Sequence, residues 1–182
     1  MHDDIERWNA RYAGRSTGEP SMPKGLGGIE LARGGRCLDV ACGLGEQSLW
    51  AAQEGFDVVA VDVSDTAITA LNSAALVAGL RDRIDTRVVD LDDGLPMELF
   101  GAFSLVICQR FRDPELYEQL VYTAEPGGVI VVTVLSHVGA SGEPGPFHAA
   151  AGDLVCAFRQ YDVDVLRSVE LDGEATLVAR RR

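Results

Sequence analysis

The sequence predicts an α/β fold: a doubly wound, mostly parallel sheet with helices on both faces and a C-terminal antiparallel hairpin. Short β-branched runs alternate with longer stretches of helical periodicity, which is typical of parallel strands joined by right-handed crossovers. The run at residues 128–135 is apolar throughout, as expected of a parallel strand that is covered on both faces. Near the C-terminus, two strand-like runs flank Asp172-Gly173, a strong hairpin signal.

The parallel part of the sheet is expected to contain five strands. They are predicted at residues 36–41, 57–63, 84–90, 103–109 and 128–135. The first crossover helix runs from Glu46 to Glu54 and ends at Gly55, a residue type that stops helices. The second helix starts at the N-cap residue Ser64 and ends near Gly79.

Two further helices are predicted. One follows the strand at 103–109, with Asp113 as its N-cap and Pro114 at its first position, and it stops before Pro126. The other lies at the N-terminus and carries Trp8 and Tyr12, which share one face because they are four residues apart.

Length and composition indicate one domain. The chain has 182 residues, of which 47% are hydrophobic, enough for one well-buried core. We therefore expect a single domain over residues 1–182, with the helix and loop at residues 1–28 as a candidate lid. No apolar run approaches the roughly 18 residues of a membrane span, and the N-terminus lacks the pattern of a secretory signal. A soluble, cytoplasmic protein is expected.

The net charge and the cysteine pattern limit the classes of ligand that we expect. The formal net charge of −12 opposes polyanions, so the sequence favours a small-molecule substrate and disfavours nucleic acid. The four cysteines show neither a CxxC pair nor a spacing suited to zinc, which indicates reduced core thiols and no metal site. They are Cys37, Cys42, Cys108 and Cys156.

The stretch CLDVACGLGEQSL, residues 37–49, turns from the first strand into a helix. Ligands of open α/β sheets bind beyond the carboxyl ends of the strands, where helix N-termini attract negative groups. Gly43 and Gly45 would let a ligand approach the backbone closely, although a tight turn also uses glycine for steric reasons alone. The loop is therefore a candidate ligand site.

Two residues decide between candidate ligands. A dinucleotide fingerprint needs a third glycine at position 48, where this chain has Ser48. Asp39, at the end of the first strand, would repel a pyrophosphate but would favour a cation. S-adenosylmethionine carries a sulfonium and an ammonium beside a carboxylate, so we expect it as the cofactor instead of a nicotinamide dinucleotide.

The next strand ends extend the cofactor site. Asp62 can accept hydrogen bonds from both ribose hydroxyls, or it can cap the following helix, for which Ser64 is the better candidate. On the ribose reading, Asp62→Asn weakens cofactor binding and barely changes folding. Asp90 could accept from the adenine amino group while Leu91 packs on the ring. Val63 and Gln109, beside these strand ends, complete the predicted cofactor set.

The sequence resembles small class I S-adenosylmethionine-dependent methyltransferases with a Rossmann-like fold, of the compact type related to the tellurite-resistance and thiopurine methyltransferase-like group. The similarity covers most of the chain. It runs through ERWNARYAG, LDVACGLGEQSLWAAQEGFDVVAVDVSDTAI, VVDLDDGLP, FSLVICQRF and EPGGVIVVTVL.

The resemblance implies roles for individual residues. The loop with Asp39, Gly43 and Gly45 would bind the methionine part, Asp62 the ribose, and Asp90 would lie beside adenine. Ala41 stands where the motif often has glycine, a mild change whose carbonyl can still meet the ammonium. The implied reaction is in-line methyl transfer to a small-molecule acceptor, driven largely by positioning and desolvation.

Catalytic residues are harder to predict. Arg110, at the end of the fourth strand, could orient an anionic substrate, or it could pair with Asp113 or another acid. His137 could act as a base or lie in a surface loop.

The N-terminal aromatic residues and the general function also leave alternatives open. Trp8 and Tyr12 could fold over the cofactor, as in the resembling group, or pack against the sheet. A nicotinamide-dependent oxidoreductase and a non-catalytic S-adenosylmethionine-binding module are the alternative functions. The methyl acceptor and the oligomeric state stay open.

Overall fold

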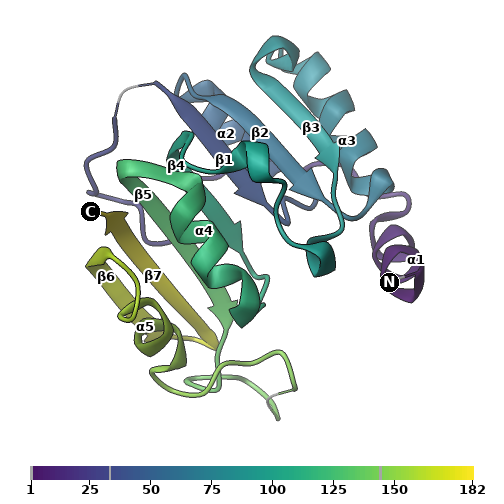
Figure 1. Cartoon of the computed structure of the whole chain (residues 1–182). Coiled ribbons are helices and arrows are strands. Elements are labelled where there is room, and N and C mark those ends of the chain that lie inside the picture. Colours follow the sequence, from purple (N-terminus) through teal and green to yellow (C-terminus); the bar gives the residue numbers. More distant parts are fainter. Residues whose placement is uncertain (1, 33, 144) are drawn as a thin grey trace.

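One mixed seven-stranded sheet organises the molecule in the computed structural model, which describes residues 2–32, 34–143 and 145–182. The strand order is β3-β2-β1-β4-β5-β7-β6 (Figure 1). The strands are β1 (Arg36–Val40), β2 (Asp57–Asp62), β3 (Ile84–Val88), β4 (Phe103–Gln109), β5 (Ala124–Leu135), β6 (Val163–Leu171) and β7 (Glu174–Arg181). The helices are α1 (His2–Tyr12), α2 (Glu46–Gln53), α3 (Asp65–Val77), α4 (Tyr117–Thr123) and α5 (Asp153–Phe158).

The sheet confirms the predicted fold class. Strands β1 to β5 pair in parallel, whereas β7 is antiparallel to both β5 and β6. The hairpin turn falls at Asp172-Gly173, where both residues have positive φ, as the two-residue turn requires. The C-terminal hairpin therefore completes the sheet beside β5.

Some element boundaries differ from the predicted ones. β3 ends at Val88, two residues before the predicted strand end, because the chain then enters a 3-10 turn at Leu91–Asp93. β5 begins at Ala124, earlier than predicted, and the helix expected after Asp113 begins as a 3-10 turn at Pro114–Leu116. The short helix α5 has no counterpart among the predicted elements.

Two apolar cores cover the two faces of the sheet. Alternating side chains of the strands pack against α4 and α5 on one face, through residues such as Leu120 and Phe158. The other face packs against α2 and α3, through Leu49 and Leu71, and against Leu26 of the N-terminal segment. Figure 1 shows α4 and α5 on the near side of the sheet.

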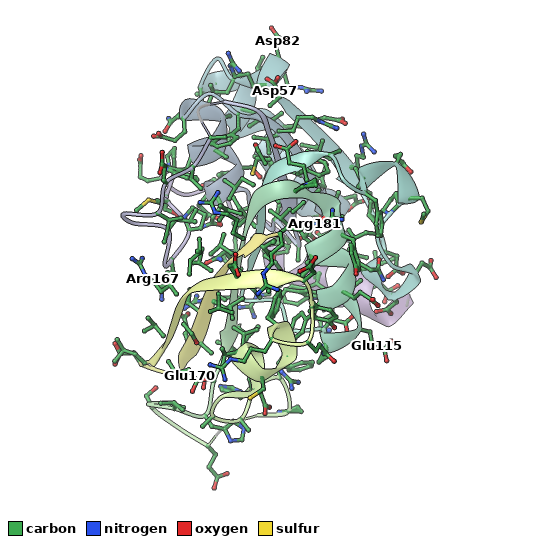
Figure 2. All side chains as sticks on the ribbon, turned by 60° about the vertical axis from the view of Figure 1, so that its left-hand side comes forward. Asp57, Asp82, Glu115, Arg167, Glu170 and Arg181 are labelled. Carbon is green, nitrogen blue, oxygen red and sulfur yellow. The ribbon has the colours of Figure 1, made fainter. Side chains whose placement is uncertain are left out.

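The N-terminal segment after α1 lies beside the C-terminal hairpin. Arg167 of β6 donates hydrogen bonds to the carbonyl oxygens of Gly25 and Gly27. In Figure 2, Asp57 lies at the top, at the amino edge of the sheet where β2 begins, and Glu170 lies lower, near the carboxyl edge where β6 ends. Segments far apart in sequence thus meet beside β7.

The cysteines are distributed differently from the expectation of four core thiols. Cys37, Cys42 and Cys108 are buried, whereas Cys156 is exposed because it lies on the outer side of α5.

None of the helices in the described part of the chain combines the length and apolar character needed to cross a bilayer.

Candidate cofactor and acceptor site

The glycine loop between β1 and α2 has left-handed backbone at Ala41, Gly43 and Gly45. A Cβ atom at Gly43 would lie 2.9 Å from the Tyr12 hydroxyl, so this glycine permits the close approach of α1. A Cβ at Gly45 would overlap the side chain of Leu71 on α3. The steric reason for Gly45 is therefore helix packing, the alternative that the sequence left open.

Ala41 is less mild a replacement for glycine than the sequence suggests. Its φ is +54°, in the left-handed region, where a Cβ costs roughly 1–2 kcal/mol. The sequence could not reveal this cost because the sign of φ depends on how the loop is folded. The residue nevertheless stays half-buried against the core on the α4 and α5 face.

Asp39 is a buried acid at the end of β1, with 2% of its surface exposed. The Ser48 hydroxyl on α2 donates a hydrogen bond of 2.5 Å to its Oδ2. Burial raises the pKa of Asp39 to about 7, against the effect of the Ser48 hydrogen bond and with added repulsion from Asp62 and Glu46. Ser48, which replaces the third glycine of a dinucleotide motif, thus serves as a partner of the acid.

Asp62 joins the end of β2 to the glycine loop. Its Oδ2 accepts from the Gly43 amide at 2.8 Å, and its Oδ1 accepts from the Ser64 amide at 2.9 Å. Burial raises its pKa despite the hydrogen bonds from the amides of Ser64, Gly43 and Val63. The cap of α3 is Ser64, whose hydroxyl accepts from the Ala67 amide. A carboxylate has about four lone-pair sites, so these three amides leave one for a ligand hydroxyl.

Helix α1 lies against α3 (Figure 1), and its Tyr12 hydroxyl approaches Gly43 of the glycine loop. Ser64 donates from its hydroxyl to Oδ1 of Asn9 at 2.6 Å. Trp8 and Tyr12 stack with ring centroids 5.8 Å apart, as their spacing predicts. Burial raises the pKa of Tyr12 to about 12, and the nearby Asp62 adds to the shift, so its hydroxyl stays protonated.

The residues predicted near adenine lie at the carboxyl end of β3. Asp90 follows the strand and caps the 3-10 turn by accepting from the Asp92 amide at 3.1 Å. Leu91 is buried in the core on the α4 and α5 face, so its side chain has little free surface for a ring. Val63 contributes its backbone amide to Asp62.

Arg110 follows β4 in a left-handed conformation with φ of +58°. Its amide donates to the Thr133 carbonyl at 2.7 Å, and its side chain passes the end of β5 to reach Glu174 on β7. Arg110 therefore pairs with an acid, which was one of its two predicted roles, and that acid is Glu174. Asp113 instead accepts from the amide of Glu115. Gln109, at the end of β4, is half-buried beside it.

Glu174 also pairs with Lys24, 150 positions earlier in the chain. Burial would raise the pKa of Glu174, but the hydrogen bonds from Lys24 and Arg110 outweigh burial and lower it. Sequence reasoning missed both partners because no local motif links them. The only sequence signal was the place of Glu174 directly after the Asp172-Gly173 turn.

A cavity of about 310 Å³ opens at the carboxyl ends of β4 and β5 and at the start of β7, which runs antiparallel to them. Its polar lining includes Arg110, Glu174, His148 and the acids Glu143 and Asp172. His137 is exposed and is not among the lining residues, although its ring lies 6.2 Å from that of His148.

Across residues 2–32, 34–143 and 145–182, no group of three or more His, Cys, Asp or Glu side chains is arranged to hold a metal ion.

Residues 37–128, about half of the chain, match the family model described as a methyltransferase domain. The chain belongs to this family. A curated relative, the ribosomal RNA small subunit methyltransferase C of Alcanivorax borkumensis, is 28% identical over an alignment of 123 residues, and the match covers 62% of this chain. The chain matches only 36% of the length of that relative.

Solved structures share the fold of this methyltransferase domain. TehB from Haemophilus influenzae is 20% identical with a TM-score of 0.68, covering 86% of this chain and 60% of TehB. A geranyl diphosphate methyltransferase in complex with GPP and sinefungin is 14% identical with a TM-score of 0.73, covering 100% and 99% of the two chains. At these identities, the likeness concerns the fold alone.

The site fits the cofactor that the sequence predicts. Burial raises the pKa of both Asp39 and Asp62 beside the glycine loop, and a bound cation would favour their ionised forms. A dinucleotide would instead place a pyrophosphate near these acids. Family membership and this acidic site together identify S-adenosylmethionine as the cofactor of this methyltransferase domain.

Proposed function

We propose that this domain transfers the methyl group of S-adenosylmethionine to a small-molecule acceptor by in-line displacement. The observation that carries the proposal is the placement of the acid pair Asp39 and Asp62 at the glycine loop, on the same sheet edge as the Arg110 cavity. When bound, the cofactor supplies an electrophilic methyl group on a sulfonium. The protein would bind both reactants and exclude water.

The cofactor roles follow from the contacts of each residue. Asp39 and the carbonyl of Ala41 would face the cationic groups, and the loop with Gly43 and Gly45 would hold the methionine part. The remaining lone pair of Asp62 would face the ribose hydroxyls and accept from them. Trp8 and Tyr12 would cover the site, with residues 1–28 as the lid of a single domain over residues 1–182. The other members of the proposed cofactor set are Val63, Asp90, Leu91 and Gln109.

On the acceptor side, Arg110 is the residue proposed to orient the substrate. His137 lies outside the cavity lining, which weakens its case as a base. His148 lines the cavity, but its Nδ1 accepts from the Gly145 amide at 3.0 Å. This hydrogen bond places the proton of the neutral ring on Nε2, so His148 would act there as a donor.

We also propose that the chain belongs to the compact group related to TehB. The motifs quoted above and the 86% coverage of this chain in the TehB comparison support that placement. The Alcanivorax relative is named for ribosomal RNA, but the net charge of −12 here disfavours a polyanionic substrate.

Melting curves and a turnover assay test the proposal. At 100 times its dissociation constant, S-adenosylmethionine or S-adenosylhomocysteine should add about 2.7 kcal/mol of stability. S-adenosylhomocysteine formation is then followed over a panel of small oxygen, nitrogen and sulfur nucleophiles and a ribosomal RNA fragment. Stabilisation by NADH alone would favour the oxidoreductase. Binding without turnover on any acceptor would favour the non-catalytic module, and turnover on RNA alone would contradict the small-molecule acceptor.

A further inference from the structure

We propose that the acceptor carries a single oxyanion, a carboxylate or a phosphate, and that the Arg110 guanidinium binds it. This inference rests on the proposed function, because it concerns the acceptor side of the same site. The starting observation is the position of Arg110 in the lining of the cavity beyond β4, β5 and β7.

The Arg110 side chain is fixed at one end and open at the other. Its Nε donates to Oε1 of Glu174 at 2.6 Å, and its Nη2 lies 2.6 Å from the same oxygen. A guanidinium has five N–H donors in a planar fork, so these two contacts leave donors for a ligand. The Arg110 side chain is 68% exposed, which makes these donors accessible from the cavity.

Glu174 is a positioning residue in this arrangement. Its side chain is only 9% exposed, and its second carboxylate oxygen accepts from Lys24. Two cations thus share one carboxylate, and the cluster of Lys24, Arg110 and Glu174 keeps an excess of positive charge in a protein of net charge −12. An oxyanion can complete this cluster through two parallel hydrogen bonds to the guanidinium.

The remaining wall limits the size and charge of the ligand. Glu143 and Asp172 are exposed acids in the lining, so they would repel a second anionic group or a polyanion. The volume of about 310 Å³ suits a small organic molecule. The geometry therefore favours a small acceptor with one oxyanion at the Arg110 end.

Calorimetric titration of simple anions tests the inference directly. Inorganic phosphate, benzoate and the neutral analogue benzamide are each titrated into the protein, with and without saturating S-adenosylhomocysteine. We expect phosphate or benzoate to bind and benzamide to bind at least about tenfold more weakly, because it lacks the charge that strengthens the hydrogen bonds. The stronger anion identifies the class. Absence of binding by both anions, or equal binding of benzamide, would overturn the proposal.

Two kinds of variant assign the effect to Arg110. Arg110→Ala, and Arg110→Gly in case alanine disturbs the left-handed backbone, should weaken anion binding about tenfold or more. The control is Arg83→Ala, which removes another exposed arginine paired with an aspartate, at the amino edge of the sheet. Equal anion affinity in wild type and both Arg110 variants would show that Arg110 is not the binding residue.

Glu174→Gln tests the positioning role. Glutamine makes the cluster more positive, so a purely electrostatic role predicts tighter anion binding, whereas loss of positioning predicts weaker binding. We expect weaker binding with unchanged affinity for S-adenosylhomocysteine. If the wild type fails to bind S-adenosylhomocysteine, the proposed function fails, while the titrations without this ligand still decide the role of Arg110.

Discussion

Asp39 couples cofactor binding to a proton. Burial raises its pKa to about 7, and the cationic groups of the cofactor favour the ionised carboxylate. Below pH 7, binding should therefore release a proton, and affinity should rise by up to about tenfold per pH unit before levelling off above pH 7. Titration calorimetry in two buffers with different ionisation heats measures the release. Asp39→Asn should abolish it, and pH-independent affinity in wild type would contradict the assignment.

The same pKa gives the unliganded protein a defined pH dependence. A carboxyl group with a raised pKa in the folded state binds its proton more tightly when folded. Its contribution to stability is therefore complete below about pH 4 and is lost as the pH rises towards 7. Saturating cofactor should reduce this loss, because the bound cation compensates the carboxylate.

Asp62→Asn should reduce both cofactor affinity and folding stability. The sequence suggested that only affinity would change, but both oxygens of Asp62 accept buried amides, from Gly43 and Ser64. The NH₂ group of asparagine donates and cannot accept, so one backbone N–H loses its partner at a cost of about 1–3 kcal/mol. Denaturant unfolding without ligand measures this cost. Unchanged stability would show that the loop rearranges freely.

At the scale of single residues, local motifs predicted the glycine-loop half of the candidate site but not the half around Arg110. Asp39 and Gly43 lie at the strand-to-helix turn after β1, and Asp62 lies at the end of the next strand, so their meeting at one sheet edge could be predicted. Arg110 could be predicted as a strand-end residue, but its partner could not. Lys24 and Glu174 meet only because β7 is inserted beside β5, which depends on the whole fold.

At the scale of the elements, Ser64 both caps α3 and links it to α1. Its side chain caps the helix through the Ala67 amide, and its hydroxyl donates to Asn9 of α1. Ser64→Ala should cost about 1 kcal/mol of stability through the lost cap. It should also loosen α1, seen as faster hydrogen exchange in α1 and altered fluorescence of Trp8. Thr66→Ala, at an exposed contact with Asp65, is the matched control. Unchanged exchange in α1 would show that other contacts hold the helix.

The elements that sequence reasoning located best have strong periodic patterns or clear end signals. The Ser64 cap and the Asp172-Gly173 turn are examples, because each is defined by chemistry within a few residues. Helix α5 has only six residues, too few to show helical periodicity. The early start of β5 at Ala124 was equally hidden, since Pro126 suggests a strand boundary there.

Over the whole molecule, the excess of acidic residues should make stability depend on salt. With 28 acidic and 16 basic residues, the folded state concentrates negative charge. Raising the ionic strength from about 0.01 M to 0.15 M shortens the Debye length from about 30 Å to 8 Å and screens this repulsion. The melting temperature at pH 7 should therefore rise. Sodium and potassium chloride should act alike, and a fall in melting temperature would indicate that ion pairs outweigh the repulsion.

The position of β7 sets an order in which the molecule can assemble. β7 follows β6 in the chain but lies between β5 and β6 in the described sheet, so β6 has its backbone partner only once the hairpin has closed. The hairpin is local, whereas its docking on β5 joins residues 39 to 51 positions apart. The glycine loop lies between β1 and β2, whose paired residues are 21 positions apart, so during refolding it can form before the hairpin docks. A chain stopped at that stage would bind S-adenosylhomocysteine before it had a place for an acceptor.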